Sequence, residues 1–180
     1  MKIPYVNLSA QWKEERDNLL PIIDEALLKE DFVAGEAIKE FERRVGKLCS
    51  VDYVVSLNSG TDALTLALHL SGVGRGDEVI TTPNSFIASA AVIVHLGAKP
   101  VFVDVLEDQN MDPAKLESAI TERTKAIMPV HLTGRMCEMD EIMRVADLLS
   151  IPVVEDAAQS IGSQYKSRPS GSIGNIGCFS

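Results

Sequence analysis

Residues 77–105 read DEVITTPNSFIASAAVIVHLGAKPVFVDV, and this stretch decides the fold class. It begins with a short β-type run, continues with an apolar segment of helical length that closes at a glycine, and ends in a second β-type run. A strand, a helix and a strand in that order form a unit whose two strands run parallel in one sheet. The stretch therefore predicts an α/β fold.

The same alternation continues on both sides of this unit. Upstream, YVVSLN at 53–58 predicts a strand, and GTDALTLALHLSG predicts a helix closed by Gly72. Downstream, the predicted segments are a helix at 112–120 with Asp112 as N-cap, a strand at 124–132, a helix at 137–150 and a strand at 151–156. Repeated units of this kind predict a mostly parallel sheet covered by helices on both faces.

The two ends of the chain depart from this alternation. Residues 9–30 and 35–49 predict two helices around the sequence DFVAGE, so residues 1–50 are expected to form a helical arm that packs on another part of the protein or on another subunit. The last residues, IGCFS, are typical of a strand that has just begun. We therefore expect 51–180 to be an incomplete domain whose sheet is cut at Ser180.

Composition restricts the class of protein. Of the 180 residues, 46% are hydrophobic and 24% are charged, which is typical of a soluble globular domain. The net charge of −9 argues against binding to nucleic acid or to an anionic membrane, because such proteins need a basic face. There is no apolar run of about 20 residues and no signal-peptide h-region near the start, so a cytoplasmic location is predicted.

The three cysteines, Cys49, Cys137 and Cys178, are widely spaced and form no CxxC pair or His/Cys cluster. This pattern predicts neither a disulfide framework nor a metal site. We expect reduced, half-buried thiols.

Three groups of residues fall where ligands of a parallel sheet bind, at the carboxyl ends of the strands. The first is NSGTDAL, in which the N–H groups around Gly60, Thr61 and Asp62 open a helix and favour a phosphate group; the alternative is an ordinary helix N-cap. A nicotinamide dehydrogenase is disfavoured, because no GxGxxG follows the first strand.

The second and third groups are PNSFIASA and PVVEDAAQ. Phe86 begins a helix after a strand, where it would either stack on a planar ligand or join the core. Side chains alternate along a strand, so Asp156 and Glu155 face opposite ways. Asp156 suits a counter-ion to a heteroaromatic nitrogen, with Gln159 near the same ring, although an N-cap role is the alternative. His131 is a weaker candidate for the crevice, because a structural histidine is the commoner case.

In this order, NSGTDAL, PNSFIASA, VVEDAAQSIG and GSIGNIGCFS resemble the DegT-type family of pyridoxal-phosphate-dependent nucleotide-sugar aminotransferases. The resemblance runs across almost the whole chain. It implies the aspartate-aminotransferase type of fold, fold type I, with the large domain present in part and the C-terminal small domain absent. It also implies a homodimer with active sites at the subunit interface and pyridoxal 5'-phosphate as cofactor.

The resemblance implies a role for each of seven positions. Gly60, Thr61 and Asp62 would bind the cofactor phosphate with Ser180 as a second ligand, Phe86 would stack on the pyridine, Asp156 would pair with the pyridine nitrogen, and Gln159 would lie near the phenolic oxygen. The family's Schiff-base lysine would come a few residues after Ser180. Because Lys125 and Lys166 do not match that place, we expect these 180 residues to be inactive alone.

The implied function is transfer of an amino group, from glutamate, to the keto group of a nucleotide-linked sugar. Two alternatives stay open. A smaller branch of the family has histidine in place of the lysine and acts as a sugar dehydratase. A non-catalytic fragment or subunit that works by association is the other alternative.

Overall fold

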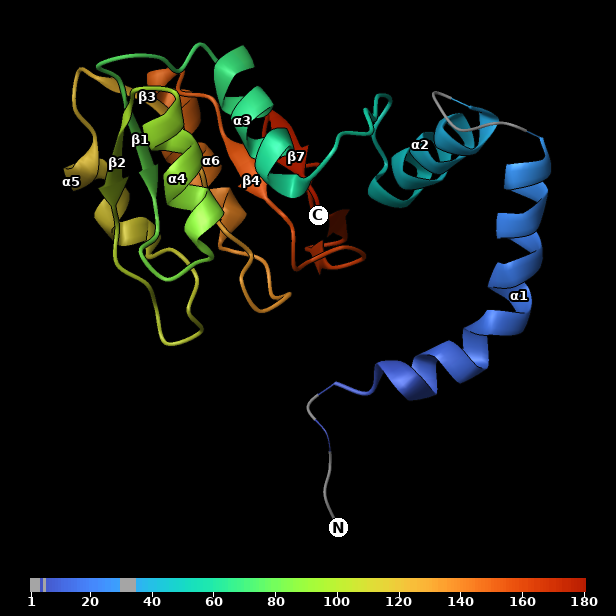
Figure 1. Ribbon diagram of the computed structural model, residues 1–180. Helices are drawn as coiled ribbons and strands as arrows, with labels where there is room; N and C mark the ends of the chain where they lie inside the picture. The colour runs from blue at the N-terminus through green and yellow to red at the C-terminus, as the bar shows by residue number, and fades with distance from the viewer. Residues whose placement is uncertain (1–3, 5, 30–34) are drawn as a thin grey trace. The chain divides into compact units, whose positions relative to one another are not determined.

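The computed structural model describes residues 4, 6–29 and 35–180. The chain divides into two compact units, 1–43 and 44–180. Figure 1 shows the helices and strands of each unit.

Two helices lie in the N-terminal part of the chain, as predicted. Helix α1 (Leu8–Leu28) begins at Asn7, whose side chain accepts a hydrogen bond from the Ala10 N–H, and α2 (Glu36–Cys49) spans the boundary between the units. Most of the predicted connection DFVAGE, residues 31–34, lies outside the described residues.

A parallel sheet forms the centre of the second unit. Strands β1 (Glu78–Thr81), β2 (Lys99–Phe102) and β3 (Thr124–Ile127) pair in the order β2-β1-β3. Strands β4 (Val154–Asp156) and β7 (Ile176–Cys178) form a second parallel pair.

Isolated parallel bridges join these two sets of strands. Ile127 pairs with Val153 and Val130 pairs with Asp156, so β4 continues the sheet beyond β3. All five strands run in one direction, and their carboxyl ends therefore lie along one edge. This is the edge where ligands of such sheets bind.

Helices cover both faces of the sheet (Figure 1). The first face packs on α3 (Gly60–Leu70) and α4 (Ile87–His95). The second packs on α5 (Leu116–Ala119), which follows the short 3-10 helix η1 (Pro113–Lys115), and on α6 (Met139–Leu149).

Alternation along the strands assigns neighbouring residues to the two cores. Val79 and Val154 are buried in the core under α3 and α4, whereas Ile80 and Val153 are buried in the core under α6. The strand–helix–strand prediction from 77–105 is confirmed.

Three details differ from the sequence-based prediction. Residues 53–58 form no strand: Tyr53 and Val55 are exposed, and within the described part of the chain no strand pairs with them. A small hairpin, β5 (Gln164–Tyr165) and β6 (Arg168–Pro169), was not predicted, because its turn adopts positive φ without the usual Asn-Gly signature. The three free cysteines are fully buried instead of half-buried.

Among the described helices, none combines the length and apolar character that crossing a bilayer requires.

Candidate functional site

A cavity of about 320 Å³ lies at the carboxyl edge of the sheet. Its walls come from the start of α3, the start of α4, the end of β4 and the residues that follow β7. Six of the seven predicted site residues line it: Gly60, Thr61, Phe86, Asp156, Gln159 and Ser180. The seventh, Asp62, is not among the described residues that line it.

One end of the cavity combines a helix N-terminus with a hydroxyl group. Ser59 caps α3 by accepting the Asp62 N–H at 3.1 Å, and the N–H groups that open a helix have no acceptor inside it. Ser180 approaches this turn so closely that a Cβ on Gly60 would lie 2.6 Å from Ser180 Cβ and 2.8 Å from its Oγ. Backbone N–H groups, a helix dipole and a hydroxyl together suit a phosphate group.

An aromatic ring forms part of the cavity wall. Phe86 is the N-cap residue of α4 and remains 73% exposed while lining the cavity. Its side chain is therefore not a core residue, which removes the alternative considered from the sequence. An exposed flat apolar surface at this place suits the face of a planar ring.

Asp156 supplies a buried carboxylate to the cavity. It is only 6% exposed, and its Oδ2 accepts a hydrogen bond of 2.8 Å from Ser89 Oγ. The Ser89 hydroxyl lies 2.7 Å from that of Ser85, which also lines the cavity. Oδ1 has a long contact of 3.4 Å from the Ala158 N–H, so the N-cap alternative contributes little. The carboxylate is oriented by a hydroxyl pair.

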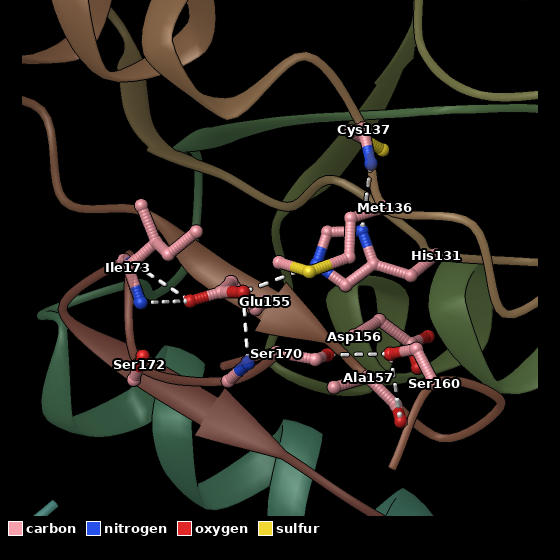
Figure 2. Close-up of polar contacts among 12 residues, drawn as sticks. His131, Met136, Cys137, Glu155, Asp156, Ala157, Ser160, Ser170, Ser172 and Ile173 are labelled. Atoms are coloured by element: carbon pink, nitrogen blue, oxygen red, sulfur yellow. Dashed lines mark hydrogen bonds and ion pairs between the residues drawn. The ribbon is translucent and has the colours of Figure 1, made fainter. Parts of the chain in front are cut away.

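Glu155 lies on the opposite side of β4, as the alternation predicts. It is completely buried and accepts four hydrogen bonds, shown in part in Figure 2. The donors are His131 Nε2 and the backbone N–H groups of Gly171, Ile173 and Gly174. Burial raises the pKa of Glu155, but these hydrogen bonds outweigh it and hold the pKa below 4.5.

His131 belongs to the same buried network and is not among the described residues that line the cavity. Its Nδ1 accepts the Cys137 N–H at 3.2 Å, so the proton resides on Nε2 and is donated to Glu155 at 3.0 Å. The structural interpretation of this histidine is therefore the one that the structure favours.

Gln159 and the residues around it are held by a second set of bonds. Gln159 lines the cavity and is exposed, and the loop that carries it is fixed by a hydrogen bond of 2.6 Å between Ser160 and Ser170 (Figure 2). Ser160 Oγ also donates to the Ala157 carbonyl. The side chain of Gln159 can therefore reach a ligand from a fixed loop.

Sequence reasoning missed Ser85 and Ser89. The available signal was a lone hydroxyl in the apolar segment IASAAVIV, three residues after Phe86 and so on the same helix face. Nothing in the spacing links that hydroxyl to Asp156, which lies 67 positions away in the chain.

The arrangement suits a planar ring that carries a phosphate and a basic ring nitrogen. The α3 turn and Ser180 could hold an anion, Phe86 could cover a ring face, and Asp156 could pair with a protonated nitrogen. The described residues contain no group of three or more His, Cys, Asp or Glu side chains placed to hold a metal ion.

Comparison with known proteins agrees with this geometry. The chain is 45% identical over 180 residues to the UDP-N-acetyl-3-dehydro-alpha-D-glucosamine 3-aminotransferase of Acidithiobacillus ferrooxidans, covering 99% of this chain and 48% of that protein. It is 39% identical to the pleiotropic regulatory protein of Geobacillus stearothermophilus, covering all of this chain and 49% of that protein. The chain therefore spans about half the length of the curated relatives that it matches.

A solved structure gives the same result. The putative sugar aminotransferase Spr1654 from Streptococcus pneumoniae, in its PLP form, superposes with a TM-score of 0.86 at 38% identity, covering 89% of this chain and 45% of that one. The predicted fold is confirmed as the α/β, mostly parallel fold of these aminotransferases. The model of the DegT/DnrJ/EryC1/StrS aminotransferase family matches residues 13–180, and the chain belongs to that family.

Proposed function

We propose that the complete protein transfers an amino group from an amino acid, glutamate, to the keto group of a nucleotide-linked sugar, with pyridoxal 5'-phosphate as cofactor. One observation carries the proposal: a single cavity is lined by a phosphate-type helix turn, an exposed aromatic ring and a buried carboxylate. Relatives named as aminotransferases or transaminases of UDP- and dTDP-linked sugars support the choice of substrate.

The residues of the cavity fit this cofactor. Gly60 and Thr61 line the cavity with Ser180, which lies so close to Gly60 that a side chain there would collide with it. A phosphate group at this end could therefore contact the α3 N–H groups and the Ser180 hydroxyl together. Phe86 would cover one face of the ring and exclude water from it, and Gln159 would contact the phenolic oxygen. When bound, pyridoxal phosphate supplies an electron sink for the carbanion formed at the amino carbon.

Asp156 provides the electrostatic part of the mechanism. Its carboxylate would favour a proton on the ring nitrogen of the bound cofactor, because a nearby opposite charge favours the protonated form. Ser89 donates to Oδ2 and fixes the carboxylate, leaving Oδ1 the freer of the two oxygens for the ring. Burial keeps water from competing for this contact.

Several further features belong to the same proposal. Residues 51–180 would be the cofactor-binding part of the large domain, and the lysine that moves the proton would follow Ser180, so these 180 residues would not turn over alone. The three free buried thiols support a reducing compartment, the cytoplasm. We also infer a homodimer in which the arm, residues 1–50, packs on a second copy, because α1 exposes Trp12 and Ile22 with other large apolar side chains.

The test uses the complete gene product, pyridoxal phosphate and glutamate. We expect the protein to retain the cofactor through gel filtration and to release 2-oxoglutarate only when a 3-keto or 4-keto nucleotide sugar is present. A protein that retains the cofactor but dehydrates the sugar without consuming glutamate would belong to the dehydratase branch. A protein that retains no cofactor would act by association, and the proposal would be wrong.

A further inference from the structure

Hydrogen bonds to the Glu155 carboxylate join three segments of the chain: β4, the loop at His131 and residues 171–174. Oε1 accepts the N–H groups of Ile173 and Gly174 at 2.7 and 2.6 Å, and Oε2 accepts that of Gly171 at 3.0 Å together with His131 Nε2 (Figure 2). Each carboxylate oxygen thus accepts two hydrogen bonds, which fills its usual capacity, and Glu155 is not among the described residues that line the cavity. Glu155 therefore fixes the backbone of 171–174 to β4.

The fixed segment determines where the end of the chain lies. Gly171 packs under the ring of Phe179, since a Cβ there would lie 2.5 Å from Phe179 Cζ, and Gly177 lies against the Gly171 backbone. Both contacts leave no room for a side chain. The position of Phe179 thus depends on the path of the backbone at 171, which Glu155 holds.

Phe179 leads directly to the phosphate end of the cavity. Its carbonyl oxygen would lie 3.3 Å from a Cβ on Gly60, and the neighbouring Ser180 lies closer still to that turn. A continuous series of close contacts therefore runs from Glu155 through Gly171 and Phe179 to the α3 N-terminus.

We propose that Glu155 is a positioning residue for the phosphate end of the cavity, acting through the 171–174 segment on Phe179 and Ser180. The inference rests on the function proposed above, because it assigns the pyridoxal phosphate group to that end. It separates the roles of the two adjacent acids: Asp156 contacts the ring, and Glu155 holds the segment that contacts the phosphate.

A glutamine cannot replace Glu155 in this role. Its amide has one acceptor oxygen, and its NH2 group would face either the Gly171 N–H or the N–H groups of Ile173 and Gly174. The amide N–H groups would then face backbone N–H donors, and those donors would lose their acceptor. The segment would shift while the side-chain volume stays nearly the same.

The experiment compares two ligands, pyridoxal phosphate and pyridoxal, which differ only in the phosphate group. Their dissociation constants are measured by fluorescence quenching on the complete gene product and on Glu155→Gln. We expect Glu155→Gln to lower the preference for the phosphorylated ligand at least tenfold while the affinity for pyridoxal changes less than threefold. An unchanged preference would overturn the inference.

Glu78→Gln is the matched control. Glu78 is a second buried carboxylate, bound to Thr121 and Arg123 at the amino end of β1, away from the cavity. Its substitution removes a buried charge in the same way but should leave the phosphate preference unchanged. An equal loss of preference in both variants would indicate general destabilisation and would also overturn the inference.

A second variant keeps the test decisive if Glu155→Gln does not fold. Gly171→Ala leaves the carboxylate in place and displaces Phe179, so the same selective loss of phosphate preference supports the inference, and an unchanged preference contradicts it. The unmodified protein tests the proposed function separately. If it binds pyridoxal and pyridoxal phosphate equally, the phosphate site itself is wrong and the inference falls with it.

Discussion

The two faces of β4 carry adjacent carboxylates that differ in how much of their hydrogen-bonding capacity is used. On one side, Glu155 is completely buried and accepts four hydrogen bonds. On the other, Asp156 is nearly as buried but has one firm bond, from Ser89, and faces a cavity. The comparison shows that burial alone does not distinguish the two acids. Asp156 differs from Glu155 in having unused hydrogen-bonding capacity beside an open space, and this difference is the basis of the role that we propose for it.

Neutralising Asp156 should have the largest effect on activity. If Asp156 is the counter-ion of the ring nitrogen, as proposed, Asp156→Asn removes that charge, and we expect amino transfer by the complete protein to fall by about 10²–10³-fold. The free energy of unfolding should change by less than about 1 kcal/mol, because only one firm protein bond is lost. Steady-state assays and urea unfolding measure the two quantities, and a variant that loses stability but keeps its rate would reverse the assignment.

Glu155→Gln should show the opposite balance in stability. Removing one partner from a buried charged network costs about 3 kcal/mol, so the urea midpoint should fall clearly. An unchanged urea midpoint is the result expected of a surface acid, and it would contradict the buried network around Glu155.

The contribution of Glu155 to stability should also depend on pH. The folded-state pKa of Glu155 is below its ordinary value of 4.5, so the unfolded chain binds the proton more readily, and the carboxylate stabilises the fold above pH 4.5. This contribution is lost as the pH falls through the lowered folded-state pKa. The difference in Tm between the unmodified protein and Glu155→Gln should therefore shrink from pH 7 to pH 3, and a constant difference would argue against a depressed pKa.

Ser89 tests how Asp156 is oriented. Ser89→Ala removes a hydrogen bond to a charged group, and we expect about a tenfold loss of rate. Ser89→Thr keeps the hydroxyl and should retain most of the rate. The 15N chemical shift of the bound cofactor's ring nitrogen gives a readout independent of turnover, and it should move in the alanine variant alone.

The smallest expected effect concerns two buried thiols, one in the core on each face of the sheet. Burial raises the pKa of both Cys178, which pairs in register with Asp156, and Cys137, which lies beside His131, to about 12. At pH 8 neither thiol should react with Ellman's reagent until the protein is unfolded. Rapid labelling of Cys178 in the folded protein would show that the reagent reaches this thiol through the cavity that it lines.

Part of this arrangement could be predicted from sequence, and the reason is local periodicity. The strand–helix–strand pattern at 77–105 and the alternation of Val154, Glu155 and Asp156 depend on neighbouring residues, so they were read correctly. The resemblance to a family supplied the site residues that line the cavity. Their roles stay predictions until the variants are measured.

The remainder depends on contacts that spacing does not encode. The bond from Ser89 to Asp156 and the approach of Gly171 to Phe179 join segments that meet only in the folded chain. The failed strand at 53–58 has a related cause, because its apolar residues favour a strand but pairing needs a neighbour. Local strand propensity is therefore insufficient where strand formation depends on a pairing partner.

The close approach of Gly60 and Ser180 has a consequence for biosynthesis. These residues stand near opposite ends of the second unit's sequence, so the proposed phosphate end of the cavity cannot form until the segment between them has left the ribosome. Closing so long a loop is among the late and entropically costly steps of folding. Capture of the cofactor would then follow the formation of β7 and would serve as a signal, visible in real time by its absorbance, that the nascent domain has folded.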